Sequence, residues 1–229
     1  TMGVPAFAVQ NLWHRYKYAP DRGYLEQTAY PAIRDVAIFQ ANYMDQCEPA
    51  AARPAKVVLA PGVSPEHWGW TRNFERNRDG TFDIAMFRFV FKAAIEGAGL
   101  LKRDETLVSR WEKCLERLPD YPTTGGDERV VVDVRDAPPI TYNIAIPAVP
   151  VFPGDQVTWF SSATERSLLA RSIDRLKWNG NNSSVIVSVA RARLSMPSSA
   201  DFMRSTFRDR LKPNGTLGLN RVGAGINRN

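Results

Sequence analysis

One short segment of the chain places a carboxylic acid among flat aromatic rings. Residues 60–70 read Ala-Pro-Gly-Val-Ser-Pro-Glu-His-Trp-Gly-Trp, so that Glu66 and His67 are followed closely by Trp68 and Trp70. Sugar rings present C–H faces that stack on indole, and cleavage of a glycosidic bond needs a carboxylic acid to protonate the leaving oxygen. The segment therefore predicts a carbohydrate site with Glu66 as its catalytic acid and His67, Trp68 and Trp70 as substrate-binding residues.

Glycoside hydrolysis normally uses a second carboxylate, and two aspartates are candidates. Asp83 follows Thr81 at the start of a predicted helix, and Asp155 lies in a Phe-Pro-Gly-Asp-Gln turn. Both also have structural interpretations, because Asp83 can support the helix cap and Asp155 can bond its local backbone. The 60–70 segment has a structural alternative too, since tryptophans can fill gaps beneath a loop and Pro-Glu can begin a helix. Asp79, in Asn-Arg-Asp-Gly, is interpreted as part of an ordinary turn.

Composition excludes several other kinds of chemistry. The chain has 229 residues, of which 44% are apolar and 24% charged, which is typical of a globular protein with a sizeable core. No apolar run reaches the roughly 18 residues of a membrane span. With two histidines and two cysteines, and no Cys-x-x-Cys, His-x-x-x-His or glycine-rich phosphate loop, we expect neither a metal nor another cofactor. Cys47 and Cys114 leave one disulfide open, although Cys114 lies on a predicted core stripe.

The net charge of +6 is concentrated near the carboxyl end. Residues 166–229 hold 12 Lys and Arg side chains against 3 Asp and Glu, whereas residues 1–165 hold 18 against 21. The basic residues are spread over helical faces without interleaved aromatics or a helix-turn-helix pattern. We therefore expect a solvated face and not a nucleic-acid site.

Helical periodicity dominates the elements that must position these residues. The apolar spacing predicts helices over 5–19 and 31–44, a helix capped by Thr81 and running to Leu101, and a helix over 105–118 capped by Asp104. Further helices are expected after Thr164, after the Asn-Gly-Asn-Asn interruption at 179–182, and over 199–211. Val130–Val134 is the clearest strand. Successive hairpins without a fixed repeat favour an all-α toroid over a solenoid, as one domain over residues 1–229, with its chemistry in the long loops 45–80 and 119–160 and minor β structure in the latter.

These features also resemble the family 95 glycoside hydrolases, which include α-L-fucosidases and α-L-galactosidases. Residues 11–25 and 29–39 look like the helix pair that opens the second half of the family's catalytic domain. The remaining matches keep their order along the chain: Ser64-Pro65-Glu66, Thr81-Phe82-Asp83-Ile84-Ala85, Val151-Phe152-Pro153-Gly154-Asp155-Gln156 and Pro213-Asn214-Gly215-Thr216-Leu217. The resemblance implies an (α/α)6 barrel, an inverting mechanism and a periplasmic or secreted protein. It matches Glu66 to the proton donor.

The same resemblance marks where this sequence departs from the family. The paired asparagines that position water would fall before Thr1, and the assisting aspartate at or beyond Asn229, so we expect the chain to hold only the central part of a catalytic domain. A His-rich stretch of fucosidases is replaced here by residues 138–147. Tyr142 and Asn143 lie in that replacement and are candidate substrate-binding residues. The resemblance therefore does not identify the sugar. We expect a plant, algal or host glycan, as for divergent family members in polysaccharide-degrading bacteria.

Two other functions fit parts of the sequence. A polysaccharide lyase on the same toroid would use a tyrosine or histidine to remove a proton and an arginine or asparagine to neutralise a uronate, with His67, Tyr142 and Arg72 as candidates. An unsaturated product that absorbs in the ultraviolet would identify that reaction. A non-catalytic helical protein would instead bind glycan, nucleic acid or another protein through the basic C-terminal face, with steep salt dependence and no need for Glu66.

Overall fold

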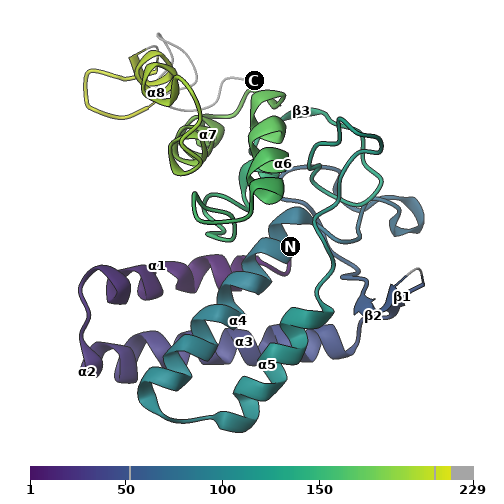
Figure 1. The fold of residues 1–229 in the computed structure, drawn as a ribbon, viewed down its shortest axis with the longest axis vertical. Coiled ribbons are helices and arrows are strands. Elements are labelled where there is room, and N and C mark those ends of the chain that lie inside the picture. Colours follow the sequence, from purple (N-terminus) through teal and green to yellow (C-terminus); the bar gives the residue numbers. More distant parts are fainter. Residues whose placement is uncertain (52, 209, 218–229) are drawn as a thin grey trace.

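The computed structural model describes residues 1–51, 53–208 and 210–217, and its fold is mostly helical (Figure 1). Proline at the first turns of two helices and the apolar spacing noted above explain where the main helices form. A π-helical turn at Leu25–Ala29 joins the short second helix to the third. The helices are α1 (Val4–Tyr18), α2 (Arg22–Tyr24), α3 (Tyr30–Asp45), α4 (Thr81–Leu101), α5 (Glu105–Arg117), α6 (Ala163–Asp174), α7 (Asn181–Arg193) and α8 (Ser199–Arg208).

Strands are short and form two separate pairs among the described residues. β1 (Pro49–Ala50) pairs antiparallel with β2 (Arg53–Val57), and β3 (Thr141–Tyr142) pairs in parallel with β4 (Lys177–Trp178). β3 confirms the minor β structure expected in the 119–160 loop. The strand predicted over Val130–Val134 is wrong. Only a single antiparallel bridge forms there, between Val131 and Thr123. The pairing extends no further, since Val131 N–H donates to Ser172 Oγ at 2.9 Å and Asp133 O accepts from Thr81 N–H at 2.8 Å.

The first group of helices, α1, α3, α4 and α5, surrounds one apolar core in the lower part of Figure 1. α4 is buried on several sides, as its apolar residues on more than one face predict, and Phe87 and Phe91 are both fully buried. Trp111 of α5 is also fully buried against this core. The amino end of α4 is fixed by Thr81, whose N–H and hydroxyl donate to Asp133 O and Val132 O.

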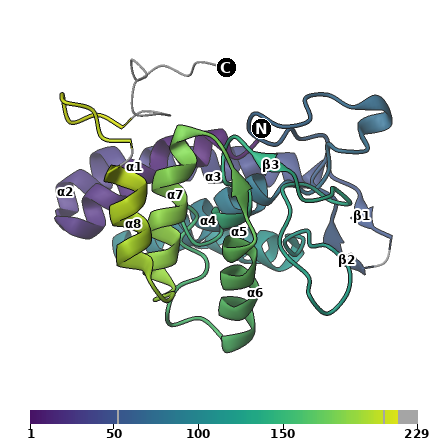
Figure 2. The ribbon, with the colours of Figure 1, turned by 90° about the horizontal axis from the view of Figure 1, so that it is seen from above.

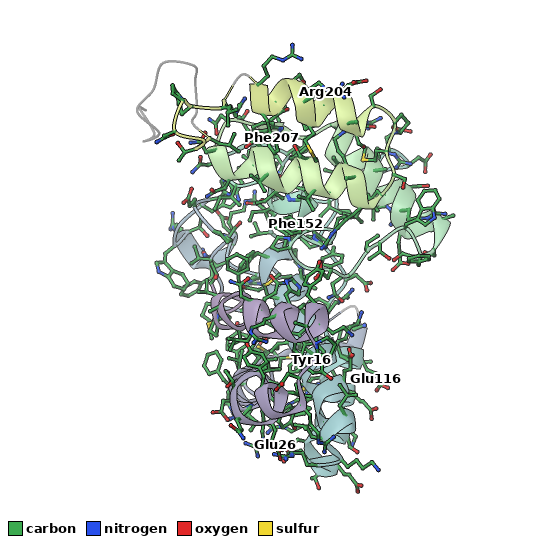
Figure 3. The ribbon with its side chains drawn as sticks, turned by 90° about the vertical axis from the view of Figure 1, so that its left-hand side faces the viewer. Tyr16, Glu26, Glu116, Phe152, Arg204 and Phe207 are labelled. Atoms are coloured by element: carbon green, nitrogen blue, oxygen red, sulfur yellow. The ribbon has the colours of Figure 1, made fainter. Side chains whose placement is uncertain are left out.

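A second group, α6, α7 and α8, packs around a separate apolar cluster that includes Leu169, Ile173, Val187 and residues of the 145–157 loop. Figure 2 shows α7 and α8 side by side, with α6 next to them. In Figure 3, Phe152 lies between the helix that carries Tyr16 and the pair α7 and α8. The 145–157 loop therefore connects the two groups, and the C-terminal helices stand above the first core.

The caps predicted for Thr81 and Asp104 are both wrong. Thr81 is the first residue of α4, and Gly80 precedes it without a side-chain cap bond. Asp104 adopts a left-handed conformation (φ 59°) and makes no side-chain cap bond. Its carboxylate instead accepts from the Tyr30 hydroxyl at 2.7 Å and pairs with Arg34 of α3. α6, expected after Thr164, begins at Ala163 and is capped by Ser162, since Ser162 and Glu165 form a reciprocal capping box. These differences arise because the sequence pattern marks a helix end without showing which polar side chain is free to reach it.

Both cysteines are free and buried, and Cys114 lies in the first core as expected. Several arginines of the basic C-terminal quarter are bound to acidic partners, such as Arg175 to Glu128 and Arg191 to Asp174. Within the described ranges, no helix is both long and apolar enough to cross a membrane.

Candidate active site

The 60–70 segment is part of a loop whose two ends, at Leu59 and Asp79, are hydrogen-bonded to each other. Leu59 and Asp79 exchange two hydrogen bonds, in which Asp79 N–H donates to Leu59 O at 2.9 Å and Asp79 Oδ1 accepts from Leu59 N–H at 2.8 Å. Asp79 is almost fully buried and also pairs with Arg135. Its assignment to an ordinary turn is therefore wrong, because its side chain holds the loop closed. Burial raises the pKa of Asp79, while Arg135 opposes this shift.

Asn77 stabilises the interior of the same loop. Its amide is fully buried and makes four hydrogen bonds. Nδ2 donates to Gly62 O at 2.9 Å and to Gly69 O at 2.8 Å, while Oδ1 accepts from the N–H and hydroxyl of Thr71. One side chain thus joins both sides of the loop, which fixes the backbone that carries Glu66.

Glu66 lies on the exposed part of this loop, and its carboxylate contacts a residue distant in sequence. Asn143 Nδ2 donates to Glu66 Oε2. The main-chain N–H of Asn143 donates to His67 Nε2 at 3.1 Å, so Asn143 bonds two consecutive loop residues. The sequence indicated Glu66 and His67 in one segment and Asn143 in another, and the structure brings the two segments together.

His67 and Tyr142 lie beneath Glu66 and are buried. Their rings meet edge to face with centroids 5.3 Å apart, and Tyr142 is only 2% exposed. Burial lowers the pKa of His67, although Asp133 and Glu66 act in the opposite direction. Burial raises the pKa of Tyr142. His67 is therefore neutral near pH 7 and accepts a hydrogen bond at Nε2, whereas Tyr142 stays protonated.

The two tryptophans of the loop have different environments. The Trp68 indole N–H donates to Asp133 Oδ2 at 2.7 Å. The Arg76 guanidinium carbon lies over the indole, 5.7 Å from the ring centroid. Trp70 is 65% exposed and meets the exposed ring of Phe74 edge to face at 5.9 Å. Trp68 thus attaches the loop to the interior, while Trp70 offers an accessible apolar face.

The two secondary carboxylates are bound away from Glu66. Asp83 is nearly fully buried and accepts from Gly3 N–H at 2.7 Å, and burial raises its pKa to about 6. Asp155 pairs with His14 Nε2 at 2.9 Å and with Arg193, so the predicted bonding to its local backbone is wrong. Burial and the nearby Arg193 lower the pKa of His14. The Asp155 turn thus contacts α1 and α7.

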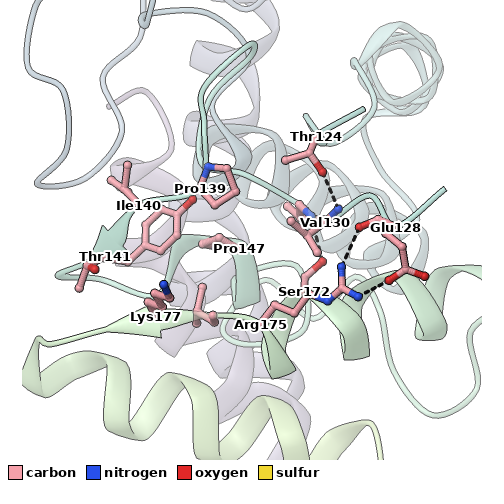
Figure 4. Close-up of a pocket in the computed structure, with 13 residues that line it drawn as sticks. Thr124, Glu128, Val130, Pro139, Ile140, Thr141, Pro147, Ser172, Arg175 and Lys177 are labelled. Atoms are coloured by element: carbon pink, nitrogen blue, oxygen red, sulfur yellow. Dashed lines mark hydrogen bonds and ion pairs between the residues drawn. The ribbon is translucent and has the colours of Figure 1, made fainter. Parts of the chain in front are cut away.

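A cavity of about 430 Å³ lies beside β3 (Figure 4). Tyr142 borders it as well as contacting His67. Figure 4 shows Arg175 bonded to Glu128 on one side of the cavity and Ser172 bonded to the backbone beside Val130. The walls combine apolar and hydrogen-bonding groups.

Asp133 and Asn77 are the site residues that the sequence did not indicate. Asp133 interrupts the apolar run Val130–Val134 and is fully buried. A lone carboxylate inside an apolar run must find partners, because burial of an unpaired charge is costly, and that signal could have identified it. Arg72, the other lyase candidate, is exposed on a short 3-10 turn at Arg72–Phe74. In the part of the chain that the structure describes, no group of three or more His, Cys, Asp or Glu side chains could hold a metal ion.

Comparison with known proteins identifies one family. The model of the glycosyl hydrolase family 95 catalytic domain matches residues 1–217. No curated protein matches the chain. The mostly helical structure agrees with the helical toroid of such a catalytic domain.

Proposed function

Because this chain belongs to glycosyl hydrolase family 95, we propose that it cleaves a glycosidic bond of a plant, algal or host glycan with Glu66 as the general acid. Family membership makes the chain a glycoside hydrolase, and the glycan, the inverting outcome and the acid are our proposals. The observation that supports Glu66 most is its position: an exposed carboxylate, in contact with the Asn143 amide, on a loop whose two ends are hydrogen-bonded to each other.

The surroundings of Glu66 supply the other parts of a sugar site. The exposed Trp70 ring, with Phe74 against it, is suited to stack on the C–H face of a sugar. The Asn143 amide beside the carboxylate can donate to a substrate oxygen. Trp68, His67 and Tyr142 are more deeply placed, and we propose that they support the loop. Asp83 and Asp155 remain candidates for the second carboxylate, each of which would have to exchange its present partners.

Hydrolysis fits these residues better than the lyase reaction does. His67 uses Nε2 to accept the Asn143 N–H and lies in a buried position, so it is poorly placed to remove a proton from substrate. Tyr142 is also buried. An unsaturated product absorbing in the ultraviolet would contradict this conclusion.

The test is the full-length Glu66→Gln variant, with Glu75→Gln as the matched control because Glu75 is an exposed glutamate of the same loop. A lost general acid lowers the rate by about 10²- to 10⁴-fold. The loss should be much smaller on aryl glycosides with acidic leaving groups, which need no protonation. Hydrolysis of a panel of plant, algal and host glycans measures the rates, and NMR of the first-formed anomer reports inversion. Undiminished activity of Glu66→Gln would refute the assignment.

A further inference from the structure

Asp133 is a fully buried carboxylate whose neighbours all belong to the Glu66 loop or support it. Asp133 Oδ2 accepts from the Trp68 indole N–H at 2.7 Å and lies 3.7 Å from His67 Nδ1. Burial raises the pKa of Asp133, and the contacts with Trp68 and His67 oppose that shift. The two residues that follow Glu66 in sequence therefore both face the same buried carboxylate.

The hydrogen bond at the other ring nitrogen fixes which tautomer His67 adopts. Nε2 accepts from Asn143 N–H at 3.1 Å, so it carries no proton in the neutral ring. The ring proton is then on Nδ1, which faces Asp133 Oδ2. A carboxylate on that side favours this tautomer, because it attracts the proton that Nδ1 carries.

Asn143 transmits the position of His67 to Glu66. Its N–H bonds the His67 ring while its side-chain amide bonds the Glu66 carboxylate. On the opposite side, Asn143 O accepts from the Ser183 hydroxyl at 2.8 Å, and a Cβ on Gly180 would lie only 1.9 Å from that oxygen. Asn143 is therefore held from both sides and has little freedom to move.

The loop backbone at this point is strained and needs such support. Glu66 and Trp68 have φ values of 61° and 65°, in the left-handed region that side-chain-bearing residues seldom adopt. Such conformations cost about 1–3 kcal/mol each and persist where surrounding contacts determine them. The Asp133 carboxylate supplies one such contact directly, through Trp68.

We propose that Asp133 is a positioning residue for Glu66: it holds Trp68 directly and fixes the His67 tautomer that binds Asn143, which in turn orients the Glu66 carboxylate. This proposal rests on the proposed role of Glu66 as the acid. It assigns Asp133 no contact with substrate. Its function is to keep the carboxylate of a strained, exposed loop in one orientation.

The test is Asp133→Asn, with Asp136→Asn as a control that makes the same chemical change at an exposed position nearby. The asparagine keeps an oxygen for the Trp68 N–H but removes the negative charge that faces His67 Nδ1, so the preference for the Nδ1-protonated tautomer, and with it the Asn143 bond, should weaken. Nitrogen-15 NMR reads this directly, because the chain has only two histidines. We expect kcat to fall about 100-fold with KM little changed, as for a misplaced catalytic group, and Asp136→Asn to alter neither.

An unchanged His67 tautomer or an unchanged kcat in Asp133→Asn would overturn the proposal. If that variant does not fold, His67→Gln and His67→Leu replace it. Glutamine offers an acceptor oxygen to Asn143 N–H and should keep most of the kcat, whereas leucine offers none and should lose it. Equal activity of the two variants would show that the bond from Asn143 to residue 67 does not position Glu66, which would refute the proposal. Failure of the proposed function is distinguishable: Glu66→Gln would then stay active, while the tautomer result in Asp133→Asn would stand by itself.

Discussion

Replacement of Asn77 by leucine should weaken the protein more than its loop location suggests. The variant keeps the branched arrangement of side-chain heavy atoms but removes all four hydrogen bonds that the amide makes across the loop. Each intramolecular hydrogen bond contributes about 1 kcal/mol net, so we expect a loss of about 4 kcal/mol in the free energy of unfolding. Buried backbone groups left without partners, such as Gly62 O, act in the same direction.

Urea denaturation followed by tryptophan fluorescence measures this loss, with Arg72→Ala as the control in the same loop. Arg72 is exposed, and its replacement should change the free energy of unfolding by no more than about 0.5 kcal/mol. The slope of the transition should stay the same in Asn77→Leu, because the surface exposed on unfolding is unaltered. A loss below about 1 kcal/mol would show that the four bonds do not hold the loop.

Two further predictions concern packing and pH. In Gly180→Ala the added Cβ would meet Asn143 O, so we expect a loss of about 1–3 kcal/mol in urea unfolding, whereas Gly125→Ala, with no neighbour within 4 Å, should be nearly neutral; equal losses would contradict this. Asp83→Asn should remove a pH dependence of the free energy of unfolding. Since burial raises the Asp83 pKa from 3.8 to about 6, the folded state binds the proton more tightly, and wild-type stability relative to the variant should fall as pH rises through that window, by about 3 kcal/mol in total. Parallel unfolding curves for the two proteins between pH 4 and 7 would exclude this role of Asp83.

Local patterns allowed the helices to be predicted well. The apolar spacing after Thr81 gave both ends of α4, because a helix that is buried on several sides carries its signal in its own residues. The Val130–Val134 run was misleading for the opposite reason. Apolar residues in sequence indicate burial, yet beyond one bridge to Thr123 its peptide groups bond to Ser172 and to the start of α4, which no local pattern reports.

The candidate site could be predicted only in part. Glu66 and His67 are adjacent and carry a recognisable chemistry, so one segment sufficed to select them. Their contact with Asn143 joins residues far apart in sequence, and nothing in either segment encodes that meeting. Asp79 and Asp133 were missed as supports because an aspartate in a turn or in an apolar run has many structural roles, and only the fold decides among them.

The segment that meets Glu66 is fastened to the C-terminal half of the chain. β3 pairs with β4, Asn179 N–H donates to Tyr142 O at 3.0 Å, and Ser183 of α7 bonds Asn143 O. A ribosome releases the chain from its amino end, and the loop with Glu66 emerges long before α7 does. The Glu66 loop can thus be made early, but its orienting partner is fixed only after residue 183 has left the exit tunnel. The contact between Glu66 and Asn143 is therefore not secured in a nascent chain until α7 has been made.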